Sequence, residues 1–441
     1  MKKLLYRFFP ALFLLALPAV GQADTAVDSS TLLRFSQDSR PGFSTKTFVP
    51  ATQFLGLDVD KLGDGKLSVH LYGWGRVDLA DKSFNDKQTG GSLTYAYAQY
   101  RLDQANGQVR VGRFFVNEGI VNEQVDGLHV RTDLPMGFGI STFGGATVHT
   151  AHQLGLGTDG KGDGIVGGRL NYRYKGMLEL GLSGVYESNA PTVNDPRVSS
   201  IFSSHRLIGG DVWLSPHRMV EIMGHTSYNT ETDGVAEHSY MLNIKPIAHL
   251  VLTGEFNEHR EANLFSSSLL FATFVQNLNE RSRSAGGSAS YELNKMTEVA
   301  ADYKHYSRDI GEADRFGGDV RFALMDKQVR TGVGYHYLRA GTNFAIAGTA
   351  SGSFHEVHGY ALQDTKTYMA SLDAIAYIFK ENINNKSSAW EFTGSLGWHI
   401  SPALILSGDL GYGKNPQFVD DLKGLLRLTY NMNYTGKGGT K

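Results

Sequence analysis

The chain has 441 residues, of which 52 are glycine and 11 are proline, and it contains no cysteine. The absence of cysteine excludes disulfide bonds, cysteine-ligated zinc and covalently attached haem. The formal net charge is −2, from 42 basic and 44 acidic residues, and this is not the charge of a nucleic-acid-binding domain. Abundant glycine, with 21 Tyr and 24 Phe, favours a protein of many β-strands over a helical enzyme.

Residues 1–23 have the three parts of a secretory signal peptide. A basic start is followed by an apolar run over residues 8–20, and the small Gly21 and Ala23 precede an expected cleavage site. Cleavage there removes three basic residues and changes the formal net charge from −2 to −5. No later run approaches about 18 consecutive apolar residues, so no transmembrane helix is expected. We therefore expect an exported protein that is periplasmic, secreted or an outer-membrane barrel.

Residues 66–434 contain short runs in which apolar and polar side chains alternate. Successive side chains of a strand point to opposite faces, so each run has one apolar face and one polar face. The last run, residues 424–434 (G-L-L-R-L-T-Y-N-M-N-Y), places Leu, Met and Tyr on one parity and Arg, Thr and Asn on the other. Residues 24–51 are polar and irregular, and residues 52–60 are either a short strand or part of the same segment. We interpret residues 24–65 as a periplasmic or lumenal arm. Residues 435–441 form a short tail.

The connections between these runs alternate between short turns and longer polar loops. Short periplasmic turns and long external loops are typical of outer-membrane barrels. The sequence therefore predicts an all-β fold, a transmembrane antiparallel β-barrel of about 18–20 strands over residues 66–434. The apolar face of each strand would contact lipid and the polar face would line a watery lumen. The alternative is a secreted all-β sandwich or solenoid with a dry core.

Charged side chains on the polar parity are the candidate lumenal residues. The early and closing strands are basic there, whereas the middle strands are acidic. Closure of the barrel would place these sets on opposed walls, and a field across the pore would select solutes by charge. A simpler interpretation is that these charges are solvated or paired. The basic set is Arg76, Arg110, Arg131, Arg169, Arg173, Arg321, Arg330 and Arg427, and the acidic set is Glu179, Asp211, Glu221, Glu237, Glu255, Glu292 and Glu298.

One long loop, residues 260–281, is unusually apolar for a segment exposed to water. Folding into the lumen would hide its apolar side chains and narrow the pore, so we predict that it is a constriction loop. The alternative is a loop on the rim or in a subunit contact. The side chains concerned are Leu264, Phe265, Leu269, Leu270, Phe271 and Phe274.

The sequence does not predict a metal site, a cofactor or an enzymatic centre. Residues 159–164 have a glycine-rich, acidic pattern, but Lys161 and Leu170 occupy positions where a calcium loop needs oxygen ligands. The two histidines in residues 355–358 lack the spacing of a helical zinc site. An outer-membrane hydrolase, with Ser and His brought together from different strands, stays open as an alternative.

The signal peptide, the alternating hairpins and the closing run together resemble those of Gram-negative outer-membrane porins. Residues 72–78 (Y-G-W-G-R-V-D) and 112–115 (G-R-F-F), with Asp126 and Gly127, are similar to segments in porins of metal-reducing bacteria. That resemblance implies that some relatives sheathe multihaem cytochromes in an electron conduit. The chain departs from these patterns in two ways, because it ends beyond its last aromatic residue and lacks paired N-terminal cysteines.

The favoured function is a water-filled porin for passive diffusion of small hydrophilic solutes or ions. The alternatives are a barrel sheath for a multihaem cytochrome and the outer-membrane hydrolase. The expected partners are outer-membrane lipid, lipopolysaccharide and the barrel-assembly machinery. A homotrimer and a multihaem cytochrome are further candidate partners, and nucleic acid is not expected.

Overall fold

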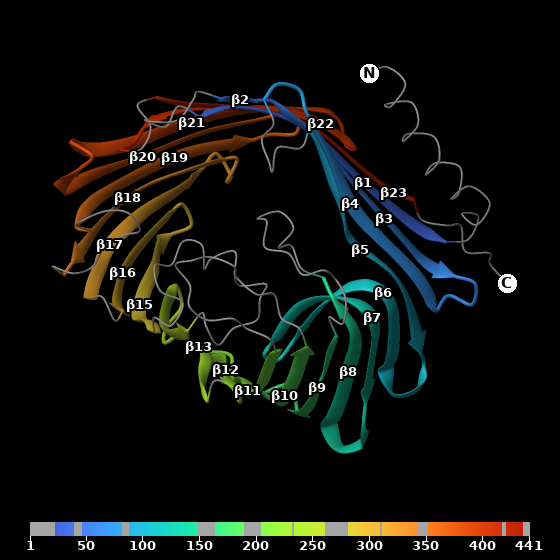
Figure 1. Cartoon of the computed structure of the whole chain (residues 1–441). Helices are drawn as coiled ribbons and strands as arrows, with labels where there is room; N and C mark the ends of the chain where they lie inside the picture. Colours follow the sequence, from blue (N-terminus) through green and yellow to red (C-terminus); the bar gives the residue numbers. More distant parts are fainter. Residues whose placement is uncertain are drawn as a thin grey trace.

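The computed structural model describes residues 23–38, 46–81, 88–148, 164–188, 204–231, 233–260, 281–308, 311–341, 352–416 and 420–434. They form one antiparallel sheet that closes on itself, and Figure 1 shows the ring of strands. Closure joins β1 to β23, in register from Thr25↔Tyr434 to Ser36↔Lys423. Closure joins the first and last strands of the sheet, as a membrane-spanning sheet requires. The predicted all-β transmembrane barrel is therefore confirmed.

Most strands of the wall have 10 to 16 residues. In chain order they are β1 (Asp24–Asp38), β2 (Lys46–Phe48), β3 (Pro50–Leu62), β4 (Leu67–Asp78), β5 (Thr89–Leu102), β6 (Gly107–Glu118), β7 (Val121–Asp133), β8 (Phe138–Thr147), β9 (Ile165–Tyr174), β10 (Leu178–Ser188), β11 (Ser204–His217), β12 (Val220–Asn229), β13 (Gly234–Ile244), β14 (Leu250–Arg260), β15 (Arg281–Asn294), β16 (Thr297–Arg308), β17 (Gly311–Leu324), β18 (Val329–Ala340), β19 (Phe354–Asp364), β20 (Tyr368–Ile383), β21 (Lys386–Ser401), β22 (Leu404–Lys414) and β23 (Asp421–Tyr434).

The barrel has 22 strands, because β2 and β3 both pair with β1 and act as one interrupted strand. The interpretation of residues 24–65 as an arm is therefore wrong, and the predicted count of 18–20 is too low. The alternation in β1 is weak because Ser29 and Thr31 share the outward parity with Leu33 and Phe35. Because these small polar side chains lie on the lipid face, β1 lacks the clear alternation of apolar and polar residues by which the later strands are recognised.

Deletion of residues 24–38 should abolish folding, because β3 and β23 would both become open edges. An arm, in contrast, would be dispensable. The shift between folded and heat-denatured mobility on a detergent gel measures assembly. A matched deletion of residues 435–441, which follow the last strand, should keep this shift. A folded barrel without residues 24–38 would contradict the closure by β1.

Lipid-facing positions carry apolar side chains around the barrel. Leu182 is 68% exposed and Leu396 is 71% exposed, although each lies in the middle of a strand. Leu426, Leu428, Tyr430, Met432 and Tyr434 of the closing strand are also exposed. Such exposure would be unfavourable in water and is favourable in hydrocarbon. The predicted facing of the closing strand is confirmed.

Both ends of the sheet-forming chain, Asp24 and Tyr434, lie at the end of the barrel that carries the short turns. Two of these turns are single 3-10 turns, η1 (Gln104–Asn106) and η2 (Pro135–Gly137). By the usual layout this is the periplasmic end, and the long connections lie outside the cell. Among the described residues there is no helix long and apolar enough to cross a membrane.

Candidate functional site

The outer halves of β6 and β7 leave the wall of the barrel. Strand β6 pairs with β5 only as far as Arg113↔Ala96, and β7 pairs with β8 only up to Val125↔Thr147. Beyond these points, residues 114–123 pair with the facing strand of the same hairpin, and Gln124 keeps one backbone bond to the wall, because its carbonyl accepts from the amide of Val148 at 2.9 Å. The two strand segments curve into the interior, as the β6 and β7 ribbons show in Figure 1. We call residues 114–124 the lumenal hairpin.

The departure from the wall depends on Gly112 and Arg113. Gly112 has a φ of +123°, and a Cβ there would collide with the carbonyl oxygen of Ala96. Arg113 donates from Nε and Nη2 to the two carboxylate oxygens of Asp126, at 2.7 and 2.6 Å, and from Nη1 to the carbonyl of Leu93 at 3.0 Å. This side chain therefore bonds strand β5 at the point where the backbone of β6 turns away.

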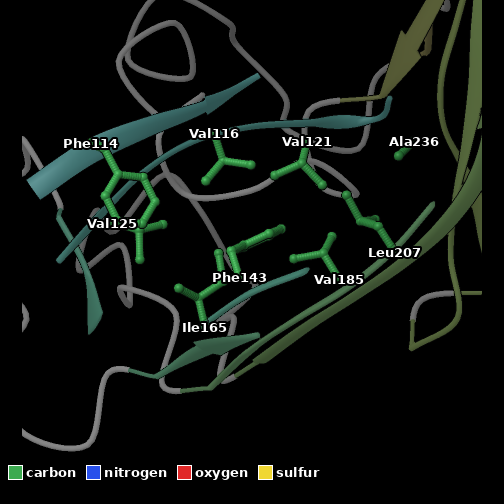
Figure 2. Packing of buried hydrophobic residues seen from close by; sticks show 9 residues of the cluster. All are labelled: Phe114, Val116, Val121, Val125, Phe143, Ile165, Val185, Leu207 and Ala236. Carbon is green, nitrogen blue, oxygen red and sulfur yellow. The ribbon is translucent and has the colours of Figure 1, made fainter. Parts of the chain in front are cut away.

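An apolar core inside the barrel holds the lumenal hairpin against the wall. Four of its side chains come from the hairpin strands and five from the wall opposite, and Figure 2 shows the two groups facing each other. None of the nine side chains is more than 5% exposed. Burial of this kind stabilises by about 25 cal/mol per Å² of apolar surface. The residues are Phe114, Val116, Val121, Val125, Phe143, Ile165, Val185, Leu207 and Ala236.

Phe114→Ala should destabilise the barrel by about 3 kcal/mol or more, because removal of a buried phenyl ring leaves a cavity. Phe114 is 1% exposed, whereas the next residue, Phe115, is 41% exposed. The matched variant Phe115→Ala should change stability by less than about 1 kcal/mol. Urea unfolding of the protein refolded in lipid vesicles compares the two. Equal effects would contradict the packed lumenal hairpin.

A polar cavity of about 420 Å³ lies beneath the lumenal hairpin. Four arginines from three strands line it, all of them predicted to face the lumen: Arg110, Arg131, Arg169 and Arg173. Asn171, Ser141, Glu118 and Glu179 add hydrogen-bonding groups. We call this cavity the arginine pocket. A water-filled pocket with several guanidinium groups attracts carboxylate or phosphate groups.

The four arginines of this pocket differ in how fully they are paired. Arg169 bonds Asp211 at 2.5 Å and Glu179 at 2.9 Å, and Arg173 bonds Glu179 at 3.1 Å. Arg110 donates to the side-chain oxygen of Gln99 at 3.0 Å and lies 5.7 Å from the ring centroid of Tyr97. Within the described ranges, neither Arg110 nor Arg131 forms an ion pair. Arg173 also lies 3.6 Å from Asp133, so Arg110 and Arg131 are the two guanidinium groups of the pocket without a carboxylate in ion-pair contact, and Glu118 in the same pocket offsets part of their charge.

Glu118 joins the end of the lumenal hairpin to the wall. Its Oε1 lies 3.2 Å from His129 Nε2, and its Oε2 accepts a hydrogen bond from the hydroxyl of Ser141. His129 is only 3% exposed. The adjacent Gly119 has a φ of +60°, and a side chain there would collide with Ser183. The hairpin is thereby fixed above the arginine pocket at both its strands and its turn.

The structure places all fifteen charged residues predicted for the lumen on the parity opposite to the lipid-facing side chains. It does not leave the acidic set free. Glu237 bonds His225, Glu255 bonds Lys304, and Glu298 bonds Arg321. Glu292 bonds His249 and Glu221 accepts from the indole of Trp213. The ion pairs of Glu255 and Glu298 weaken the field of the acidic wall, whereas the neutral indole of Trp213 leaves the charge of Glu221 in place.

A second polar cluster lies across the ring, on β16 to β19. Oxygen and nitrogen atoms of Asp302, Asp319 and His336 lie within 4.8 Å of one another, a donor set that could hold a divalent cation. Arg315 already lies 3.0 Å from Asp302 and 3.5 Å from Glu356. The cluster is thus an ion-pair network in which a guanidinium group balances the carboxylates.

The sequence alone does not reveal the lumenal hairpin, because residues 117–124 (N-E-G-I-V-N-E-Q) have the largely polar composition of a loop. A signal was present in β6, where both parities are apolar: Phe114 and Val116 on one side, Val111 and Phe115 on the other. A strand between lipid and a watery lumen needs only one apolar face. Two apolar faces on one strand therefore indicate that its second face is also buried. The predicted constriction loop, with Leu264 to Phe274, lies outside the described residues, as do residues 1–22 and 435–441.

No family model and no curated protein matches this sequence. Among solved structures, it is similar to a mutant of the ferric enterobactin receptor PfeA of Pseudomonas aeruginosa, at 11% identity and a TM-score of 0.55, over 93% of this chain and 81% of that chain. It is also similar to the translocation pore of the P pilus usher PapC, at 7% identity and a TM-score of 0.50, over 93% and 100%. A third is OccAB4 of Acinetobacter baumannii, at 10% identity and a TM-score of 0.48, over 94% and 98%.

The chain has the fold of a large, closed antiparallel β-barrel. At such low sequence identity, these structural similarities show only the fold. The solute that the barrel passes must be inferred from the side chains of its lumen. In a barrel of this size the wall alone would enclose a wide channel. The segments that lie inside the wall therefore decide its width, and the described one is the lumenal hairpin.

Proposed function

We propose that this barrel is a passive diffusion channel for small hydrophilic solutes that favours anions. The observation that carries the proposal is the lumenal hairpin, fixed above a pocket with two unpaired arginines. A hairpin built from wall strands narrows the lumen. The arginine pocket on its periplasmic side lowers the energy of an anion at the narrow section.

The charge balance of the described lumen supports anions over cations. Acidic side chains on the middle strands are bonded to His, Lys, Arg or Trp side chains. Arg110 and Arg131 in the pocket, and Arg330 and Arg427 elsewhere on the lumenal parity, form no ion pair with a described residue. These four guanidinium groups are the positions in the described lumen where an anion would be attracted.

The two alternatives receive less support from this geometry. A sheath for a multihaem cytochrome needs a wide lumen, and the lumenal hairpin occupies part of it. A hydrolase needs a serine bonded to a histidine, whereas Ser141 and His129 both bond the carboxylate of Glu118. Co-purification of a haem protein would nevertheless favour the sheath.

Single-channel recording of the refolded protein in a planar bilayer tests the proposal. We expect steady open steps and, under a salt gradient, a reversal potential of the sign that indicates anion preference. A closed barrel would overturn the diffusion channel. An open barrel with cation preference would overturn only the role of the arginine pocket.

A further inference from the structure

Asp302, His336 and Glu356 lie in one row across the lumenal face of β16 to β19. The register pairs Asp302 with Gly317 and Gly317 with His336, and His336 pairs in turn with Glu356. Because Gly317 has no side chain, the carboxylate of Asp302 and the imidazole of His336 meet across β17, with Oδ1 and Nε2 2.8 Å apart. A Cβ at Gly317 would collide with the imidazole ring. The row therefore brings an acid and a histidine from two separate strands into direct contact.

Asp319 adds a third group at the same point of the wall. It lies opposite Gly334, where a Cβ would collide with its carboxylate. Its Oδ2 lies 4.0 Å from Nε2 of His336, and one atom from each of Asp302, Asp319 and His336 lies within 4.8 Å of the others. Two ligands of one zinc ion lie roughly 3–4 Å apart, because each is about 2.1 Å from the metal. The spacing of the three groups is therefore close to that of ligands around a single cation.

The imidazole of His336 has one ring nitrogen without a hydrogen-bond partner among the described residues. The side chain is only 8% exposed, and its buried Nδ1 lies 3.7 Å from Oε1 of Glu356. A neutral imidazole has one N–H group and one lone pair. With the proton on Nε2, the lone pair of Nδ1 faces Glu356, and with the proton on Nδ1, the lone pair of Nε2 faces Asp302. Either tautomer therefore directs a lone pair at a carboxylate.

A cation between Nε2 and the two aspartates would remove this repulsion. We propose that Asp302, Asp319 and His336 bind a first-row divalent cation of the zinc class inside the lumen, with Glu356 as the partner of Nδ1. Nδ1–H would then donate to the carboxylate of Glu356, as histidines that bind metals commonly do. One imidazole with two carboxylates suits Zn²⁺ better than Ca²⁺ or Mg²⁺, which prefer oxygen ligands alone. We call these four residues the lumenal histidine site.

Two arginines orient the carboxylates of the lumenal histidine site. Arg315 donates from Nη1 to Oδ2 of Asp302 at 3.0 Å, and Nη2 of Arg321 lies 3.8 Å from Oδ2 of Asp319. Because Arg315 bonds Oδ2 of Asp302, the other oxygen remains directed at His336. The positive charge of Arg315 opposes a metal ion nearby, so Arg315→Gln should bind Zn²⁺ about threefold more tightly.

Titration of the refolded barrel with Zn²⁺, followed by calorimetry, tests this site. The protein carries no histidine tag and is first treated with EDTA, and we expect one tightly bound Zn²⁺ per chain. His336→Gln and Asp302→Asn should each weaken binding at least about tenfold, and Glu356→Gln should weaken it about tenfold. The matched variant His225→Gln changes another lumenal histidine, which lies 3.0 Å from Glu237 on β13, and should bind as the unmodified protein does.

Three results would overturn the proposal. Absence of binding at micromolar Zn²⁺ would leave the lone pair of His336 to a proton, and the cluster would be an ion-pair network around an imidazolium. Equal affinity of His336→Gln, Asp302→Asn and the unmodified protein would place the metal elsewhere. Equal affinity for Ca²⁺ would show that the imidazole is not a ligand.

The heat-dependent gel shift shows whether each variant is folded, and Asp302→Asn, which keeps the shape of the side chain, decides the test if His336→Gln does not fold. Binding is measured without transport. Failure of the proposed diffusion channel would therefore leave this test unaffected.

Discussion

Replacement of residues 114–124 by an Asn-Gly turn should raise the single-channel conductance at least about twofold, because the narrowest section limits the current. The new turn would join Arg113 to Val125, which are close to a register pair at the base of the hairpin. Phe143, Val185 and Leu207 should be changed to serine in the same variant, since they would otherwise face water. Conductance in a planar bilayer at fixed salt is the measurement.

The matched control deletes residues 264–275, the constriction predicted from the sequence. If the lumenal hairpin sets the width, this second deletion should have the smaller effect. A large rise in conductance after deletion of residues 264–275, with no change in the hairpin variant, would show that this loop forms the constriction. A further control carries the serine substitutions of Phe143, Val185 and Leu207 and keeps residues 114–124. It shows whether these substitutions alone change the conductance.

Loss of Arg110 and Arg131 together should reduce the anion-to-cation permeability ratio at least about fivefold. One unit charge about 4 Å from an ion in water contributes about 1 kcal/mol, and this energy corresponds to about a fivefold factor. The variant Arg110→Gln/Arg131→Gln keeps side chains of similar length and hydrogen-bonding ability. Reversal potentials under a tenfold salt gradient give the permeability ratio.

The control removes the same number of charges elsewhere on the lumenal parity. Arg330→Gln/Arg427→Gln changes β18 and β23, away from the arginine pocket, and should have a smaller effect. High salt should shrink the difference between the variants, because it screens exposed charges. Similar ratios in both double variants would show that total lumenal charge decides selectivity, and that the pocket has no special role.

The later strands could be predicted from the sequence because a membrane barrel imposes a strict two-residue period. From residue 67 onward the structure has twenty strands, which agrees with the alternation of polar and apolar residues. By the same period, Arg169, Glu179 and Arg427 lie on the parity opposite to the lipid-facing side chains of their strands. Lipid contacts every strand on one face, so each strand carries the pattern independently of its neighbours.

The partners of these charges could not be predicted, because they depend on register between strands. Arg169 and Asp211 are 42 residues apart and meet across β10. A shift of one residue in either pairing would move one of them to the lipid face. The partners of the acidic set and the two arginines of the pocket without an ion pair are therefore properties of the assembled sheet.

The sequence by itself determined the class of fold and the facing of its side chains, since both follow from the period of a single strand. Only the tertiary structure decided that β1 closes the barrel, because Ser29 and Thr31 conceal its lipid-facing pattern. Only the tertiary structure also placed residues 114–124 inside the lumen. Their apolar partners Phe143, Val185 and Leu207 belong to other strands, and burial of one surface by another requires both to be in place.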